Sequence, residues 1–246
     1  MEPDNFFKIT ENFIVFQTFL IVIIVPVFCA LCISIFHRFI FAKEFFSIFS
    51  SLVVVFFNFS LVLFFLEGRS FNIDLIEVFP NVGLSFHIEP LGLVFSSIAS
   101  SLWFVNSIYS IGYLRGNSEQ NQTRFYAYVS LSIFAVMGIA FSSNLFTFFL
   151  FYELLTFLTY PLVTHNGSSN AKQGGKIYLG ILLFTSICFL LLAICITYSF
   201  AGTLDFSKGG ILPNELSNTE ITILLLTFCF GVGKAALFPF HGWLPA

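Results

Sequence analysis

Residues 125–163 read FYAYVSLSIFAVMGIAFSSNLFTFFLFYELLTFLTYPLV. Only the polar tripeptide 142–144 interrupts this apolar run, which is too long for one bilayer crossing, because a spanning helix takes about 20 residues. We therefore predict two membrane helices, over 125–142 and 144–164. The second of them carries one charged residue, Glu153.

Similar apolar segments recur along the rest of the chain and predict five more spanning helices, over 13–36, 46–66, 91–113, 177–200 and 221–241. Hydrophobic residues make up 57% of the 246 positions and charged residues only 9%, against roughly a quarter charged in soluble domains. There is too little charge to cover a water-exposed surface. We predict an all-α polytopic membrane protein with about seven transmembrane helices.

Composition also excludes several classes of function. The net charge of −3 and the lack of a basic run argue against binding to nucleic acid. The five cysteines all fall in apolar stretches, where neither a disulfide framework nor a zinc site is normally built; they are Cys29, Cys32, Cys188, Cys195 and Cys229. No dinucleotide fingerprint or phosphate-binding loop is present, so we expect no metal site and no redox cofactor.

The lysines and arginines in the loops predict the orientation of the helices. Loops after odd-numbered helices hold Arg38, Lys43, Arg115, Arg124, Lys172 and Lys176, and the other side holds Lys8, Arg69 and Lys208. The richer side should be cytoplasmic, which places the N-terminus outside. The longest loop, 67–90, has short alternating pieces around Pro80 and predicts a small external β-hairpin between the second and third helices. We see no soluble domain and predict one membrane domain over 1–246.

Two charged residues lie inside the predicted helices, Glu153 and Lys234. Both fall near the middle of the bilayer, and their depths differ by only about 6 Å at the rise of an α-helix. Placing a charge there costs several kcal/mol, so an intramembrane ionisable residue suggests a functional site. Burial disfavours the charged form of each group and proximity favours it, which makes a switchable proton relay possible. A salt bridge that only locks two helices is the alternative.

The backbone around Lys234 favours the relay. Gly231, Gly233 and Pro239 flank it, and each weakens or interrupts regular helical hydrogen bonding. A broken helix exposes backbone groups to a hydrated cavity, as in ion-coupled transporters. The glycines can instead serve only to admit a neighbouring helix, and the two interpretations are compatible. Pro161 should perturb the end of the Glu153 helix in the same way as Pro239.

Two histidines are possible accessory groups. His165 follows the Glu153 helix and His241 lies one to two turns beyond Lys234. Either can pass protons near neutral pH, and either can equally be a polar cap at the membrane interface. The sequence leaves both interpretations open.

The segments around the two charges resemble the antiporter-like membrane subunits of respiratory complex I (its subunits 2, 4 and 5) and of Mrp-type multisubunit sodium/proton antiporters. The matching segments are FYELLT at 151–156, YPLV at 160–163, GKAALFPFHGWLP at 233–245, YSIGY at 109–113 and RFY at 124–126. The similarity begins near residue 84, and the first two helices match in hydropathy only.

The resemblance implies a role for each charge and a larger fold. Glu153 would correspond to the family's fifth-helix glutamate and Lys234 to the lysine of its broken seventh helix, the pair proposed to drive proton translocation. The family's fold is a bundle of about fourteen helices with two inverted five-helix repeats. Residues 1–120 would be the N-terminal helices with the hairpin, and 121–246 an incomplete first repeat, so the chain looks like the N-terminal half only, from a fragment or a split or decaying gene.

We therefore expect a proton-translocating subunit of an NADH-quinone oxidoreductase-like assembly in a bacterial or mitochondrial inner membrane, with other membrane subunits as partners and no electron chemistry of its own. Sodium/proton exchange in an Mrp-like complex is the close alternative. A structural subunit or an inactive remnant is a third interpretation.

Overall fold

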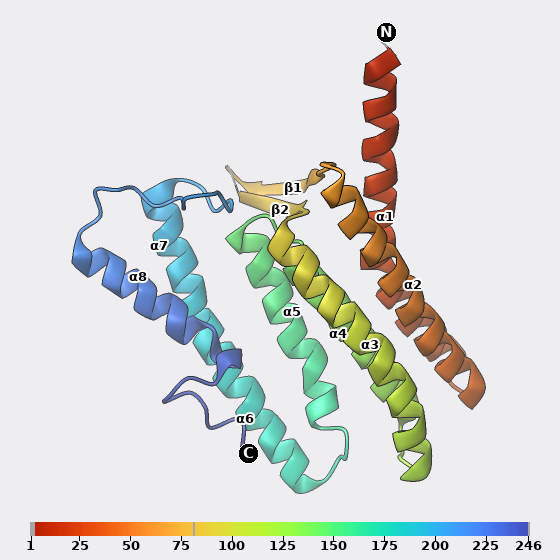
Figure 1. Ribbon diagram of the computed structural model, residues 1–246. Helices are drawn as coiled ribbons and strands as arrows, with labels where there is room; N and C mark the ends of the chain where they lie inside the picture. The colour runs from red at the N-terminus through yellow and green to blue at the C-terminus, as the bar shows by residue number, and fades with distance from the viewer. Residues whose placement is uncertain (1–2, 81, 246) are drawn as a thin grey trace. The chain divides into compact units, whose positions relative to one another are not determined.

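The computed structural model describes residues 3–80 and 82–245, and helices make up most of this part of the chain (Figure 1). The helices are α1 (Pro3–Ile35), α2 (Ile40–Leu66), α3 (Pro90–Gly116), α4 (Gln122–Ala140), α5 (Leu145–Val163), α6 (Ser169–Thr185), α7 (Leu192–Ala201) and α8 (Asn218–Gly231). A π-helical turn, η1 (Ser186–Leu191), joins α6 to α7, and a 3₁₀ turn, η2 (Gly233–Ala235), follows α8.

Six of the described helical segments are long and apolar enough to cross a membrane, and α8 is a shorter apolar helix. The sixth segment is continuous from α6 through η1 to α7 and contains 33 residues. The protein is thus a multi-pass integral membrane protein, as predicted. Regular helix ends at Gly231, so the predicted extent of the last helix, to residue 241, is wrong. Val232 leaves the helical conformation there, and only a single 3₁₀ turn follows it.

The chain divides into two compact units. The first unit contains Met1–Ile73 and His87–Phe141, and the second contains Asp74–Phe86 and Ser142–Ala246. The single membrane domain expected from the sequence stays a prediction.

In the first unit, α1 to α4 pack through small and polar side chains. The Ser47 hydroxyl donates to Ser107 at 3.1 Å, and buried Asn58 donates its amide to Ser97 at 2.9 Å. A guanidinium to carboxylate pair, Arg115 Nε to Glu44 Oε1 at 2.7 Å, lies at one end of this interface. Small hydroxyl side chains let membrane helices approach closely and satisfy each other, so this serine-rich interface explains how α2 and α3 associate.

The predicted hairpin is confirmed. It consists of β1 (Asn72–Phe79) and β2 (Val82–His87), which pair with each other between α2 and α3 in the chain. In the second unit, β2 lies against the start of α5, where Phe86 pairs with Ser142 as an isolated antiparallel bridge.

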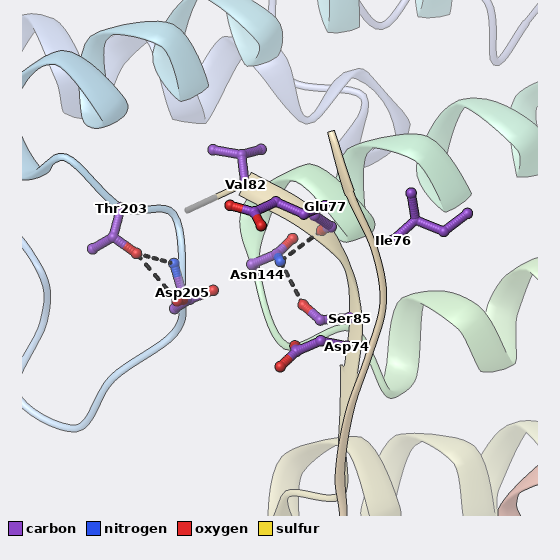
Figure 2. A pocket seen from close by; sticks show the side chains of 9 residues that line it. Asp74, Ile76, Glu77, Val82, Ser85, Asn144, Thr203 and Asp205 are labelled. Atoms are coloured by element: carbon purple, nitrogen blue, oxygen red, sulfur yellow. Dashed lines mark hydrogen bonds between the residues drawn. The ribbon is translucent and has the colours of Figure 1, made fainter. Parts of the chain in front are cut away.

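The polar tripeptide 142–144 does separate two helices, α4 and α5. Asn144 is the N-cap of α5: its side-chain oxygen accepts from the Thr147 N–H at 2.7 Å. Its amide group donates to the Gly83 carbonyl at 2.9 Å and to the Ser85 hydroxyl at 2.6 Å (Figure 2). These bonds satisfy both the oxygen and the nitrogen of the buried Asn144 side chain. They therefore fix the start of the helix that carries Glu153.

Figure 1 shows α8 running toward the middle of the long α6 to α7 helix. The contact is made at η1, where a Cβ atom on Gly231 would lie 2.6 Å from the Leu190 nitrogen. Such an approach admits only glycine. The π-helical turn at this contact was not predicted from the sequence, which suggested an uninterrupted α-helix over 177–200.

Candidate functional site

Lys234 lies in η2, directly after the end of α8. Two backbone conformations bracket it: Val232 has φ −83° and ψ 63°, and Ala236 is left-handed with φ 52°. Lys234 therefore projects from an interrupted segment of backbone and not from a regular helix.

The glycines on either side of the interruption allow close packing. A Cβ on Gly233 would meet the Thr185 hydroxyl on α6, and a Cβ on Gly231 would meet the backbone of Leu190 in η1. Both glycines thus allow a neighbouring helix to approach closely, which is compatible with a break in the helix at the same place. Close packing at this point brings the segment around Lys234 against α6 and η1.

The Lys234 side chain is bound by neutral oxygens of α5. Its ammonium donates to the Tyr152 carbonyl at 3.0 Å and to the Thr156 hydroxyl at 2.6 Å. The same nitrogen lies 3.3 Å from the centroid of the Tyr152 ring, a cation–π arrangement. The Lys234 backbone N–H donates to the Tyr152 hydroxyl at 3.2 Å. Tyr152 and Thr156 are both buried, so the ammonium is held by dipoles in a site largely removed from solvent.

Glu153 follows Tyr152 directly and is half-buried. Its Oε1 atom is buried and has no hydrogen-bond partner, while Ser186, at the start of η1, lies beside its carboxyl group. No ion pair joins the two described residues Glu153 and Lys234, although they attract each other through space. A buried carboxyl oxygen without a partner is costly, so this atom is the natural place for a proton or a water molecule.

A cavity of about 460 Å³ lies at the other end of α5. Figure 2 shows the side chains around it, with Asn144 and Ser85 on one side and Asp205 on the other. Asp74 and Glu77 of β1 also line it. Within the described ranges, no group of three histidine, cysteine or acidic side chains is arranged to hold a metal ion. The acidic side chains that line the cavity create a negative potential, which attracts cations in general.

Within the described residues, the hydrogen bonds and the ring contact of the Lys234 ammonium involve only Tyr152 and Thr156, and not the other residues singled out in the sequence. Pro161 is inside the last turn of α5, which continues to Val163. His165 is half-buried just beyond that helix. Pro239 and His241 are exposed in the turns after η2, and the His241 ring stacks on Phe238 at 5.7 Å.

Sequence reasoning missed three residues of the site. Tyr152 and Thr156 lie four residues apart on one face of α5, next to Glu153, and this spacing was a usable signal. Ser186 gave no comparable signal, because its position depends on the π-helical turn.

Residues 142–246, which include this whole site, match the family model described as NADH:quinone oxidoreductase/Mrp antiporter, transmembrane. Through this segment the chain belongs to that family of antiporter-like membrane subunits. The family suggested by the sequence motifs is thereby confirmed.

Individual members of the family are similar over about two thirds of the chain. NADH-quinone oxidoreductase subunit N of Desulforudis audaxviator is 30% identical over 168 residues, which cover 68% of this chain and 33% of that protein. Chloroplastic NAD(P)H-quinone oxidoreductase subunit 5 of Ipomoea purpurea is 31% identical over 64% of this chain and 23% of its own length. The putative antiporter subunit mnhA2 of Staphylococcus haemolyticus is 29% identical over 67% and 21%, respectively. The chain thus spans a third or less of these curated relatives.

A solved structure extends the likeness to nearly all of this antiporter-like chain. A subunit of the membrane-bound sulfane sulfur reductase, an archaeal respiratory membrane complex, superposes with a TM-score of 0.78 at 19% sequence identity. The match covers 93% of this chain and 47% of that one. The two proteins share a fold over this region.

Proposed function

We propose that the chain is a proton-translocating membrane subunit of a complex I-like assembly and that Glu153 and Lys234 form its relay. One observation carries the proposal: the Lys234 ammonium, at an interruption of its helix, is bound by the Tyr152 carbonyl and the Thr156 hydroxyl, while the neighbouring Glu153 keeps a buried, unpartnered oxygen.

This arrangement suits reversible protonation better than a structural salt bridge does. A hydroxyl can accept a hydrogen bond from an ammonium and donate one to a neutral amine, so Thr156 can satisfy Lys234 in both charge states. A carboxylate bonded directly to the ammonium would strongly favour the charged form. Glu153 acts on Lys234 by electrostatic attraction and not through a hydrogen bond. A change in the charge of Glu153 therefore shifts the proton occupancy of Lys234 without breaking a contact.

The transported ion is proposed to be the proton. The Tyr152 carbonyl oxygen and the Thr156 hydroxyl oxygen bind the ammonium, so neither is available to a metal cation while Lys234 is charged. Sodium/proton exchange is a second candidate, favoured by the similarity to a putative antiporter subunit. The relatives are named as subunits of larger assemblies, and we propose the same for this chain, with other membrane subunits as its partners.

The test is proton translocation by the complete protein in its membrane assembly, reconstituted into vesicles. Glu153→Gln and Lys234→Ala should each abolish most pumping, and Lys172→Ala, which removes an exposed lysine from the first turn of α6, should not. Normal pumping by both relay variants would refute the proposal and leave a structural role. A rate that requires sodium would favour exchange.

A further inference from the structure

One amide side chain on the outer surface of the first unit lies at a depth where lipid would surround it. Asn106 is exposed on α3, a helix long and apolar enough to cross a membrane. Because α3 runs from Pro90 to Gly116, its midpoint is residue 103, and Asn106 lies about 5 Å from that point along the axis. The hydrocarbon layer is about 30 Å thick, so Asn106 falls inside it, where lipid offers an amide no hydrogen bond.

Asn58, on the buried face of α2, shows how an amide is satisfied inside this unit. It is buried, its oxygen accepts from the Ser96 hydroxyl at 2.8 Å, and its nitrogen donates to Ser97 at 2.9 Å. Asn106, by contrast, takes part in no hydrogen bond among the described residues. Its one acceptor and two donor hydrogens are therefore open to a group outside this part of the chain.

Asn106 belongs to a stripe of exposed side chains along α3. Leu102, Tyr109 and Tyr113 are also exposed, and the four residues follow one another at spacings of four, three and four. Side chains at these spacings share one face of a helix, and the alternation of three and four is the pattern by which a second helix packs against it. The Tyr109 and Tyr113 rings stack with centroids 5.9 Å apart, which gives the stripe a continuous surface.

The outward face of α2 lacks such a polar group. Every exposed residue of this helix is apolar, and most of them are phenylalanine, for example Phe45, Phe49 and Phe56. The Ser60 hydroxyl on the same helix donates to the Phe56 carbonyl at 3.1 Å, so it needs no external partner. The face of α2 thus suits lipid, whereas the stripe on α3 suits another protein helix.

We propose that the α3 stripe, made of Leu102, Asn106, Tyr109 and Tyr113, binds one transmembrane helix of another membrane subunit. The partner helix supplies an amide or hydroxyl side chain at the depth of Asn106, because polar side chains of these kinds join membrane helices by hydrogen bonds. The inference rests on the proposed function, which gives the chain membrane partners, and it assigns the surface that one of them contacts.

The size of the stripe residues favours a different subunit over a second copy of this chain. Membrane helices approach closely where at least one of them presents small residues. Leucine and two tyrosines already fill the α3 side of the contact. A second copy in the same orientation would present the same large side chains, whereas a different helix can present glycine, alanine or serine opposite the tyrosines.

The amide can be tested by substitution in the complete membrane assembly, with the association of the subunits measured in a detergent titration. Asn106→Leu removes the amide at similar size and should weaken association about 3- to 30-fold, the contribution of one hydrogen bond between membrane helices. Asn106→Gln keeps an amide and should retain most of the association. Phe56→Leu, on the outward face of α2, is the control and should leave association unchanged.

The identity of the neighbour can be tested by photochemical cross-linking in the same assembly. A benzoylphenylalanine in place of Tyr109 should link to a transmembrane segment of another subunit, and mass spectrometry should find an asparagine, glutamine, serine or threonine within one helical turn of the depth of Asn106. The same group in place of Phe56 should link only to lipid. A link from position 109 to lipid alone, to a second copy or to another part of the same polypeptide would overturn the inference.

The outcomes are separate from those of the proposed function. Lysine leucine exchange is not involved in either readout: Lys234→Ala should stop pumping and leave association unchanged. If Lys234→Ala pumps normally while position 109 links to another subunit, the relay fails and the surface stands. If Asn106→Leu associates as tightly as Phe56→Leu, the surface is wrong whatever the pumping rate.

Discussion

The contact between Gly231 and η1 gives a sharp prediction about stability. In a Gly231→Ala variant the new Cβ would lie 2.6 Å from the Leu190 nitrogen, 2.7 Å from its Cα and 2.8 Å from its Cβ. An ordinary contact begins near 3.4 Å, so α8 and η1 would have to separate by about 0.8 Å. Backbone atoms cannot rotate out of the way, and overpacking of this kind costs about 1 to 3 kcal/mol.

The measurement is thermal unfolding of the purified protein in detergent, followed by loss of the monodisperse peak. For a protein of this size each kcal/mol shifts Tm by about 2 to 4 °C, so Gly231→Ala should lower Tm by several degrees. Gly180→Ala is the control, because a Cβ at Gly180 in α6 meets nothing within 4 Å; it should be neutral or slightly stabilising, since alanine favours helix. Equal Tm values for the two variants would refute the packing argument.

Two further predictions concern α5. Thr156→Val should lower proton pumping strongly, because the Lys234 ammonium loses its hydroxyl acceptor, whereas Thr156→Ser should retain it; equal rates in vesicles would contradict the role of that hydroxyl. Asn144→Ala should cost about 1 to 2 kcal/mol in unfolding experiments, because it removes the N-cap and the amide bonds to Gly83 and Ser85. Asn144→Asp keeps the cap acceptor and loses the amide donor, so its stability should lie between the alanine variant and wild type.

Hydropathy predicted most of the fold because the property that it measures, an apolar length close to the bilayer thickness, decides where a membrane helix lies. The split of 125–163 at its polar tripeptide and the hairpin between α2 and α3 followed from local residues alone. The exact end of α8 did not, although Gly231 and Gly233 mark the region around Lys234 as one where helical hydrogen bonding is weakened. A hydropathy average is taken over about 20 residues, so it cannot resolve a change of backbone conformation at one residue, Val232. The segment up to residue 241 remains mostly apolar, so the average still predicts a helix there.

The sequence predicted the two charged residues of the site but not the residues that contact them. An isolated acid and an isolated base stand out in an apolar chain, so Glu153 and Lys234 could be found by elimination. The partners of Lys234 depend on how α5 is rotated, because Tyr152 and Thr156 reach the ammonium only from one face. The position of Ser186 depends on a π-helical turn, a local change in hydrogen bonding that side-chain hydropathy does not encode.

The interruption at Lys234 also shows how irregular backbone is accommodated in an apolar environment. A free N–H or carbonyl costs several kcal/mol in lipid, so an interrupted membrane helix needs internal partners. The Gly233 carbonyl accepts from the Trp243 indole, and the Lys234 N–H donates to the Tyr152 hydroxyl. One of these partners, Tyr152, also holds the Lys234 ammonium through its own carbonyl. The groups that stabilise the interruption therefore also hold Lys234 in place, so removing either partner should disturb the fold and the proton conduction together.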